Sequence, residues 1–218
     1  MAESATPAYP AGITVDPQYD DRNRLTVFFR IILAIPHLIL VGGGPVTIGS
    51  FAFFGPGDWQ FGGGTTGVIG VVAFVCAVIS WFAILFASQH PRGLWDLCHF
   101  YLRWRVRAVA YTMLLRDNYP PFGDAEYPAA YRCEGPPEER NKLSVALRIF
   151  YVIPHGIILW ILGIAWSITA IIAWFAILFT GSYPRGLYDF AVSVFRWGIR
   201  VETYVLLMRD EYPPFSLT

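Results

Sequence analysis

Two stretches of this chain carry nearly the same sequence, and this duplication limits the possible folds more than any other feature. Residues 81–122 read WFAILFASQHPRGLWDLCHFYLRWRVRAVAYTMLLRDNYPPF, and residues 174–215 read WFAILFTGSYPRGLYDFAVSVFRWGIRVETYVLLMRDEYPPF. Aligned without a gap at an offset of 93, they agree at 22 of 42 positions. Charged and turn-forming residues recur together with apolar ones, so the sequence predicts the same local structure twice.

A weaker match precedes each of these stretches. Residues 9–37 agree with residues 127–155 at 12 of 29 positions, at an offset of 118. The offset falls to 93 because the first copy holds 25 additional residues in its Gly-rich segment 42–67, where ten of 26 residues are glycine. Glycine at this density opposes a helix, so this segment is expected to form a loop.

The composition is typical of a membrane protein. Hydrophobic residues make up 55% of the chain and charged residues only 15%, whereas a soluble domain has about 45–50% and about 25%. The formal net charge is zero, which argues against nucleic acid as a partner because phosphate binding needs a basic surplus.

Apolar runs and breaks divide the chain into two repeats. Residues 1–24 are expected to be a flexible lead-in and residues 123–142 a polar linker. Repeat 1 (25–122) is predicted to hold helices at about 25–41, 68–87 and 94–116, with the Gly-rich outer loop 42–67. Repeat 2 (143–215) is predicted to hold helices at about 143–161, 164–181 and 187–209.

The expected fold is an all-α integral membrane protein of two parallel tandem repeats. Each repeat would be a transmembrane helical hairpin followed by one amphipathic interfacial helix. No basic residue lies between Arg30 and Arg92 or between Arg148 and Arg185, so the positive-inside rule places both termini in the cytoplasm. Hairpins that dip into the inner leaflet without crossing are the alternative geometry.

Four polar residues recur inside the first predicted helix of each repeat: Arg30, His37, Arg148 and His155. Ionisable groups within a bilayer are functional candidates, here for a proton or ion path. The competing interpretation is structural, with the arginine reaching the headgroups and a neutral histidine donating to a helix carbonyl.

A second recurrent set lies on the predicted interfacial helices. Its arginines could bind a lipid headgroup or form ion pairs with the aspartates, and a solvated helix face is the simpler interpretation. The set consists of Arg92, Asp96, Arg103, Arg107, Arg185, Asp189, Arg196 and Arg200.

The sequence offers no nucleophile–base pair, no phosphate-binding loop and no cysteine spacing typical of a metal site. Cys76, Cys98 and Cys133 are each absent from the other copy and are expected to be free thiols. We therefore expect no enzymatic activity, no cofactor and no metal.

The recurrent Arg-x5-Pro-His helix, followed by WFAILF, PRG-L-x-D, RW and YPPF, resembles bacterial membrane proteins of the "domain of unknown function 4389" family. The resemblance runs from about Tyr9 to Phe215 in two copies. It implies a bacterial plasma membrane location and transfers no catalytic residue.

Three functional hypotheses follow. The first is a non-enzymatic multi-pass membrane protein that acts as an accessory or scaffold subunit of a membrane complex. The second is an anionic-lipid-binding or membrane-shaping protein, and the third is a small transporter or channel that uses His37 and His155. The expected partners are membrane lipids and another membrane protein or a second copy of the chain.

Overall fold

The computed structural model describes residues 9–42, 67–123, 125–137 and 140–217. Within them the chain is mostly helical. The elements are β1 (Ala11–Val15), α1 (Arg24–Phe28), α2 (Arg30–Val41), α4 (Gly67–Ala87), α5 (Arg92–Thr112), β2 (Ala129–Cys133), α6 (Lys142–Thr180) and α7 (Arg185–Val205). Most of the predicted outer loop, residues 43–66, lies outside the described residues.

The second repeat contains one uninterrupted helix where the sequence predicted two. Helix α6 runs for 39 residues through both Pro154 and Gly163, so the predicted turn between 143–161 and 164–181 is wrong. A single glycine costs a helix only about 1 kcal/mol, and Gly163 is buried in the stripe of α6 that packs on the rest of the protein.

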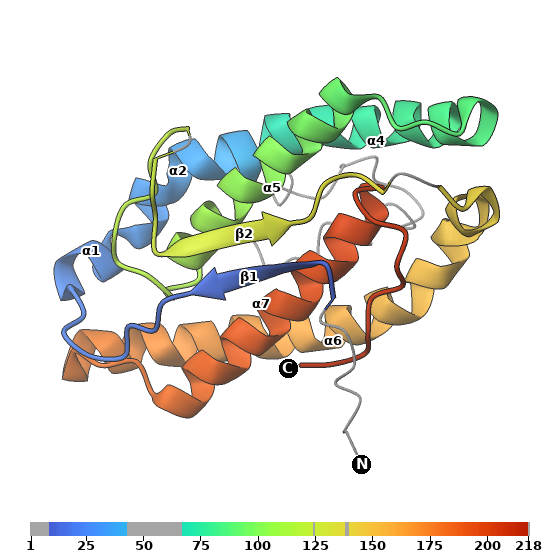
Figure 1. The fold of residues 1–218 in the computed structure, drawn as a ribbon. Coiled ribbons are helices and arrows are strands. Elements are labelled where there is room, and N and C mark those ends of the chain that lie inside the picture. The colour runs from blue at the N-terminus through green and yellow to red at the C-terminus, as the bar shows by residue number, and fades with distance from the viewer. Residues whose placement is uncertain (1–8, 43–66, 124, 138–139, 218) are drawn as a thin grey trace, which may run out of the picture.

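Helices α1, α2 and α4 form the equivalent of α6 in the first repeat. Val41 ends α2 and Gly67 begins α4, and the alignment matches them to the consecutive residues Leu159 and Trp160. A Cβ on Gly67 would lie 2.5 Å from backbone atoms of Leu40 and Val41, so α4 begins directly beside the end of α2. Figure 1 shows α1, α2 and α4 following one another along one side of the molecule and α6 along the other.

Recurrent capping residues set the helix boundaries. Asn23 begins α1, and Asn141 begins α6; each side chain accepts a hydrogen bond from the backbone N–H three residues later, at 3.1 Å. This is the usual N-cap arrangement for asparagine. Both α5 and α7 begin after a proline with extended backbone, Pro91 and Pro184.

The C-terminal ends of α5 and α7 are also alike. Leu114 and Leu207 follow these ends with φ of 64° and 60°. In both turns the next amide donates to a helix carbonyl five residues earlier, Leu115 to Ala110 and Met208 to Thr203. This is the Schellman arrangement, usually built on glycine. Both leucine side chains are buried.

A two-stranded antiparallel ribbon occupies the segments predicted to be lead-in and linker. Ile13 of β1 pairs with Tyr131 of β2, and the alignment makes these two residues equivalent. Alternate side chains of both strands are buried, which is the period-two pattern of a half-covered strand. Only five residues long, each strand was too short for its alternation to be recognised.

The ribbon lies over α5 and α7, which pack in turn on the long apolar helices (Figure 1). The expectation that α5 and α7 lie at a membrane interface stays a prediction, but the ribbon covers part of each helix that the sequence pattern had left to solvent. Residues 104–111 of α5 are all buried, because the ribbon covers one side of the helix and α2 and α4 cover another.

The long helical segments of the two repeats lie against each other, with the C-terminal end of each beside the N-terminal end of the other. Trp81, near the end of α4, donates its indole N–H to the carbonyl of Val145 near the start of α6, at 3.0 Å. Trp174, near the end of α6, donates in the same way to Val27 of α1, at 3.1 Å. The two long helical segments therefore run antiparallel.

Candidate functional site

Arg30 and Arg148 are buried in their helices and hold the C-terminal ends of α5 and α7. Arg30 donates to the carbonyls of Tyr111 and Arg116 at 3.0 and 2.6 Å, and Arg148 donates to the carbonyl of Tyr204 at 2.6 Å. Tyr111 and Tyr204 lie in the last turns of α5 and α7, where the helix dipole favours a cation.

An aspartate completes each of these arginine sites. Asp117 Oδ1 lies 2.6 Å from Arg30 Nη2 and 2.8 Å from Arg22 Nη2. In the second repeat, Asp210 Oδ1 lies 2.7 Å from Arg148 and 3.2 Å from Arg140. We call each Arg–Asp–Arg group, Arg22–Asp117–Arg30 and Arg140–Asp210–Arg148, a clamp.

The first clamp fixes the charge state of its aspartate. Burial by itself raises the pKa of the Asp117 carboxyl, but the Arg22 guanidinium, the Asn23 amide and Arg30 outweigh it, so this pKa is lowered from its usual 3.8. The carboxyl is thus ionised near neutral pH. A charge-assisted cluster of this kind joins α2, the start of α1 and the end of α5 into one unit.

Each Pro-His histidine is enclosed by aromatic side chains. His37 Nδ1 accepts the indole N–H of Trp104 at 3.0 Å, and the ring of Phe122 stacks on the imidazole with centroids 4.6 Å apart. Tyr119 covers a further side at 5.0 Å.

The second repeat repeats this enclosure. His155 Nδ1 accepts from Trp197 at 3.1 Å, and Phe215 and Tyr212 lie 3.8 and 4.8 Å from its ring. The YPPF motif that closes each repeat therefore places a tyrosine and a phenylalanine against this histidine. Since Nδ1 accepts, a neutral imidazole carries its proton on Nε2. Both histidines are fully buried. The structural interpretation expected each imidazole to donate to a helix carbonyl, whereas in the described residues each Nδ1 accepts from an indole and each Nε2 is without a hydrogen-bond partner.

The exposed members of the second predicted set lie at the starts of α5 and α7. Arg92, Asp96, Arg185 and Asp189 are all exposed. Asp189 accepts a hydrogen bond from the Tyr19 hydroxyl at 3.0 Å, and the Arg185 guanidinium lies 5.3 Å from the Tyr19 ring centroid. Tyr19 thus ties the segment after β1 to the start of α7.

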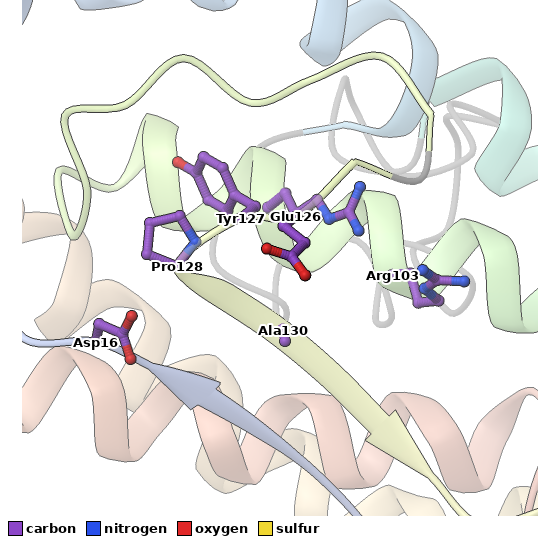
Figure 2. A pocket seen from close by; sticks show the side chains of 7 residues that line it. Asp16, Arg103, Glu126, Tyr127, Pro128 and Ala130 are labelled. Carbon is purple, nitrogen blue, oxygen red and sulfur yellow. The ribbon is translucent and has the colours of Figure 1, made fainter.

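Arg103 and Arg107 of the same set line an open cleft beside β2. The cleft encloses about 500 Å3 and is also lined by Asp16, Glu126 and Tyr127. Figure 2 shows the carboxylates of Asp16 and Glu126 and the guanidinium of Arg103 around it. Two acids face two arginines here, so the charge of the cleft does not favour an anion.

The matching arginines on α7, Arg196 and Arg200, are half-buried. Burial and the neighbouring positive charge of Arg196 lower the pKa of Arg200. In α5, Arg107 is more deeply buried and donates to the carbonyl of Gly123. These arginines are therefore partly structural, which the sequence pattern alone did not indicate.

One buried charged cluster has no counterpart in the duplication. Arg105 Nε on α5 lies 3.0 Å from Glu202 Oε1 on α7, and the Tyr101 hydroxyl donates to the same carboxylate at 3.2 Å. Arg105 also donates to the carbonyl of Val41 at 3.0 Å. The Arg105 side chain thus binds a carbonyl at the end of α2, where the long helical segment of repeat 1 is interrupted. In repeat 2 the equivalent segment, α6, is uninterrupted, and the residue aligned with Arg105 is Gly198.

Sequence reasoning missed Arg22, Arg140, Asp117, Asp210 and the Arg105–Glu202 pair as parts of the site. The first four had a usable signal, since Arg22 recurs as Arg140 at an offset of 118 and Asp117 recurs as Asp210 at 93. Arg105 and Glu202 do not recur, so nothing in the repeat pattern marks them. Among the described residues, no three histidine, cysteine or acidic side chains are grouped in a way that could hold a metal ion.

Comparison with known proteins gives one match. The model of the family "Domain of unknown function (DUF4389)" matches residues 64–123 and 142–216, which is one segment in each repeat. No curated protein and no solved structure matches the chain.

Proposed function

The chain belongs to the DUF4389 family, and we propose that it is a non-enzymatic membrane protein that acts as an accessory or scaffold subunit, with its long apolar helices in lipid. The observation that carries this proposal is the distribution of exposed apolar side chains. Among the described residues, none of the large hydrophobic side chains that are exposed lies on α5, α7, β1 or β2, whereas α2, α4 and α6 hold 29 of them.

The exposure of these side chains is high. Phe86 is 81% exposed, Phe179 77% and Ile31 75%. Helices α4 and α6 are the two described helices that are long and apolar enough to cross a membrane, and only 33% and 22% of their most apolar stretches are buried. A core helix of a soluble protein would be mostly buried. Each large apolar side chain removed from water stabilises the molecule by about 1.5–3 kcal/mol. We therefore expect lipid to cover the exposed apolar side chains of α2, α4 and α6.

The polar groups support a structural role. The clamps join helix ends, and both Pro-His histidines accept indole hydrogen bonds and stack on a phenylalanine ring. A proton path through His37 and His155 would need these contacts to open, which makes the transport hypothesis weaker than the scaffold hypothesis. Lipid-headgroup binding has less support as well, since Asp16 and Glu126 share the cleft of Arg103 and Arg107.

Extraction of the tagged protein in native lipid nanodiscs, followed by mass spectrometry, tests this proposal. A stoichiometric protein partner would support the scaffold role and identify the complex. Enrichment of one lipid class without a protein would favour lipid binding instead. Recovery of the protein in the soluble fraction after cell lysis, without any membrane, would contradict the membrane location itself.

A further inference from the structure

We infer that the long helices lie in the plane of the membrane within one leaflet, with α5, α7 and the ribbon on the water side. This inference rests on the membrane location proposed above. It replaces the predicted transmembrane hairpins with a monotopic arrangement, and four features of the structure lead to it.

The first feature is the length of α6. Its 39 residues extend for about 58 Å at 1.5 Å per residue, while the hydrocarbon core is about 30 Å thick and takes about 20 residues. The residues on both sides of Gly163 are apolar and exposed to a similar degree. An upright α6 would therefore expose a long apolar segment to water on at least one side, and an in-plane α6 would not.

The second feature is the pairing of α6 with α7. Going along α6, Arg148 contacts Tyr204, His155 contacts Trp197 and Trp166 packs on Phe195. The two helices therefore pack against each other in antiparallel directions, and Arg196, between Phe195 and Trp197, lies at the level of the middle of α6. An upright α6 would bring this arginine near the centre of the bilayer, where a charged side chain is strongly disfavoured.

The third feature is the exposed face of α6. Phe150, Ile157, Ile164 and Ile171 follow one another at seven-residue intervals, and each is at least 40% exposed. Seven residues are close to two helical turns, so these side chains share one side of the helix. The opposite side is the buried stripe that contains Arg148, His155, Leu159, Trp166, Ala173 and Ile177. One continuous apolar face along the whole helix is typical of a helix lying in a membrane surface.

The fourth feature is the relation between the two repeats. Their long helical segments are antiparallel, and β1 and β2 are also antiparallel and pair at the equivalent residues Ile13 and Tyr131. Figure 1 shows the ribbon in the centre in front, α5 and α7 on its two sides and α6 behind α7. A half-turn about an axis through the ribbon exchanges the two repeats and leaves both polar helices on the same side. Such an axis along the membrane normal is compatible with in-plane helices, because both repeats then present their apolar face to one leaflet.

Depth-dependent quenching tests this arrangement. Single cysteines are introduced as Phe150→Cys, Ile157→Cys, Ile164→Cys and Ile171→Cys in the full chain, with the native Cys76, Cys98 and Cys133 replaced by alanine. Each variant carries a bimane label and is reconstituted into phosphatidylcholine–phosphatidylglycerol vesicles that contain doxyl groups at a shallow or a deep acyl position. Asp189→Cys on exposed α7 serves as the water-side control.

The in-plane arrangement predicts that all four α6 labels show the same ratio of shallow to deep quenching and that the Asp189→Cys label is not quenched. An upright α6 would overturn the inference while leaving the membrane location intact, because successive labels would then differ by about 10 Å in depth. Absence of quenching at all four sites would contradict the membrane location as well. Polarised infrared spectroscopy of the unlabelled protein in aligned bilayers gives a second measurement, and amide I dichroism of upright helices would also refute the inference.

Discussion

Replacement of the clamp aspartate is the most direct test of the site. In Asp117→Asn, the guanidinium groups of Arg22 and Arg30 lose their counter-charge while their side chains stay 0% and 2% exposed. Removal of one partner from a buried ion pair costs about 3–5 kcal/mol, because the remaining charge is left without compensation. Two arginines share this carboxylate, so we expect the upper half of that range.

Thermal unfolding of the protein in detergent or nanodiscs, followed by circular dichroism, measures this cost. For a chain of about 200 residues, 1 kcal/mol corresponds to about 2–4 °C, so we expect Asp117→Asn to lower Tm by about 8–20 °C. The matched control is Asp96→Asn at the exposed start of α5, which should change stability by less than about 0.5 kcal/mol. A fall in Tm no larger than that of the control would refute the reasoning.

The pH dependence of the same clamp has a defined sign. Because the folded-state pKa of Asp117 is lowered, its contribution is fully present above the unfolded-state value of about 3.9 and is lost as the pH falls through the folded-state pKa. The wild type should therefore lose stability on acidification below about pH 4. Asp117→Asn should lose less over the same range, since it has no carboxyl to protonate at this position.

Three further predictions use the same unfolding assay. Trp197→Phe removes the indole donor to His155 and should cost about 0.5–1.5 kcal/mol; an unchanged Tm would show that this hydrogen bond is not needed. Glu202→Gln leaves Arg105 buried without its counter-charge and should cost about 3–5 kcal/mol, with a smaller loss for the double change Arg105→Met, Glu202→Leu; equal losses would contradict the pairing. Gly67→Ala adds a Cβ 2.5 Å from backbone atoms at a φ of 61° and should destabilise the protein. Its control, Gly186→Ala, adds a Cβ with nothing within 4 Å and should stabilise the protein by up to about 1 kcal/mol. The reverse order of stability would be incompatible with the close approach of α4 to α2.

The repeat pattern predicted much of the helical structure. The recurrent Pro-Arg-Gly turn predicted the starts of α5 and α7 to within two residues, but both helices end four residues before the predicted 116 and 209. The charge-free run from Val68 to Ala87 became α4. What failed was the expected turn near Gly163. The apolar run was divided there because about 20 residues suffice to cross a bilayer, whereas α6 continues through Gly163 for 39 residues.

The polar site was predicted only in part, for reasons of tertiary structure. Arg30 and His37 were recognised as unusual because they interrupt an apolar helix. Their partners Asp117 and Trp104 are distant in the chain and look like ordinary residues at the end or in the middle of a polar helix. The ribbon was missed because its two strands gain their partners only from each other, across more than a hundred residues.

The junction between Val41 and Gly67 has a consequence for protein engineering. The residues on its two sides occupy neighbouring positions of one long helical segment, so the path of the chain leaves and rejoins that segment at nearly the same point. An inserted reporter whose own termini are close together could replace residues 43–66 without changing the distance that the host chain must bridge. The first repeat thus contains a site where length can vary independently of the helical framework, while the equivalent position in α6, between Leu159 and Trp160, tolerates no such addition without breaking a continuous helix.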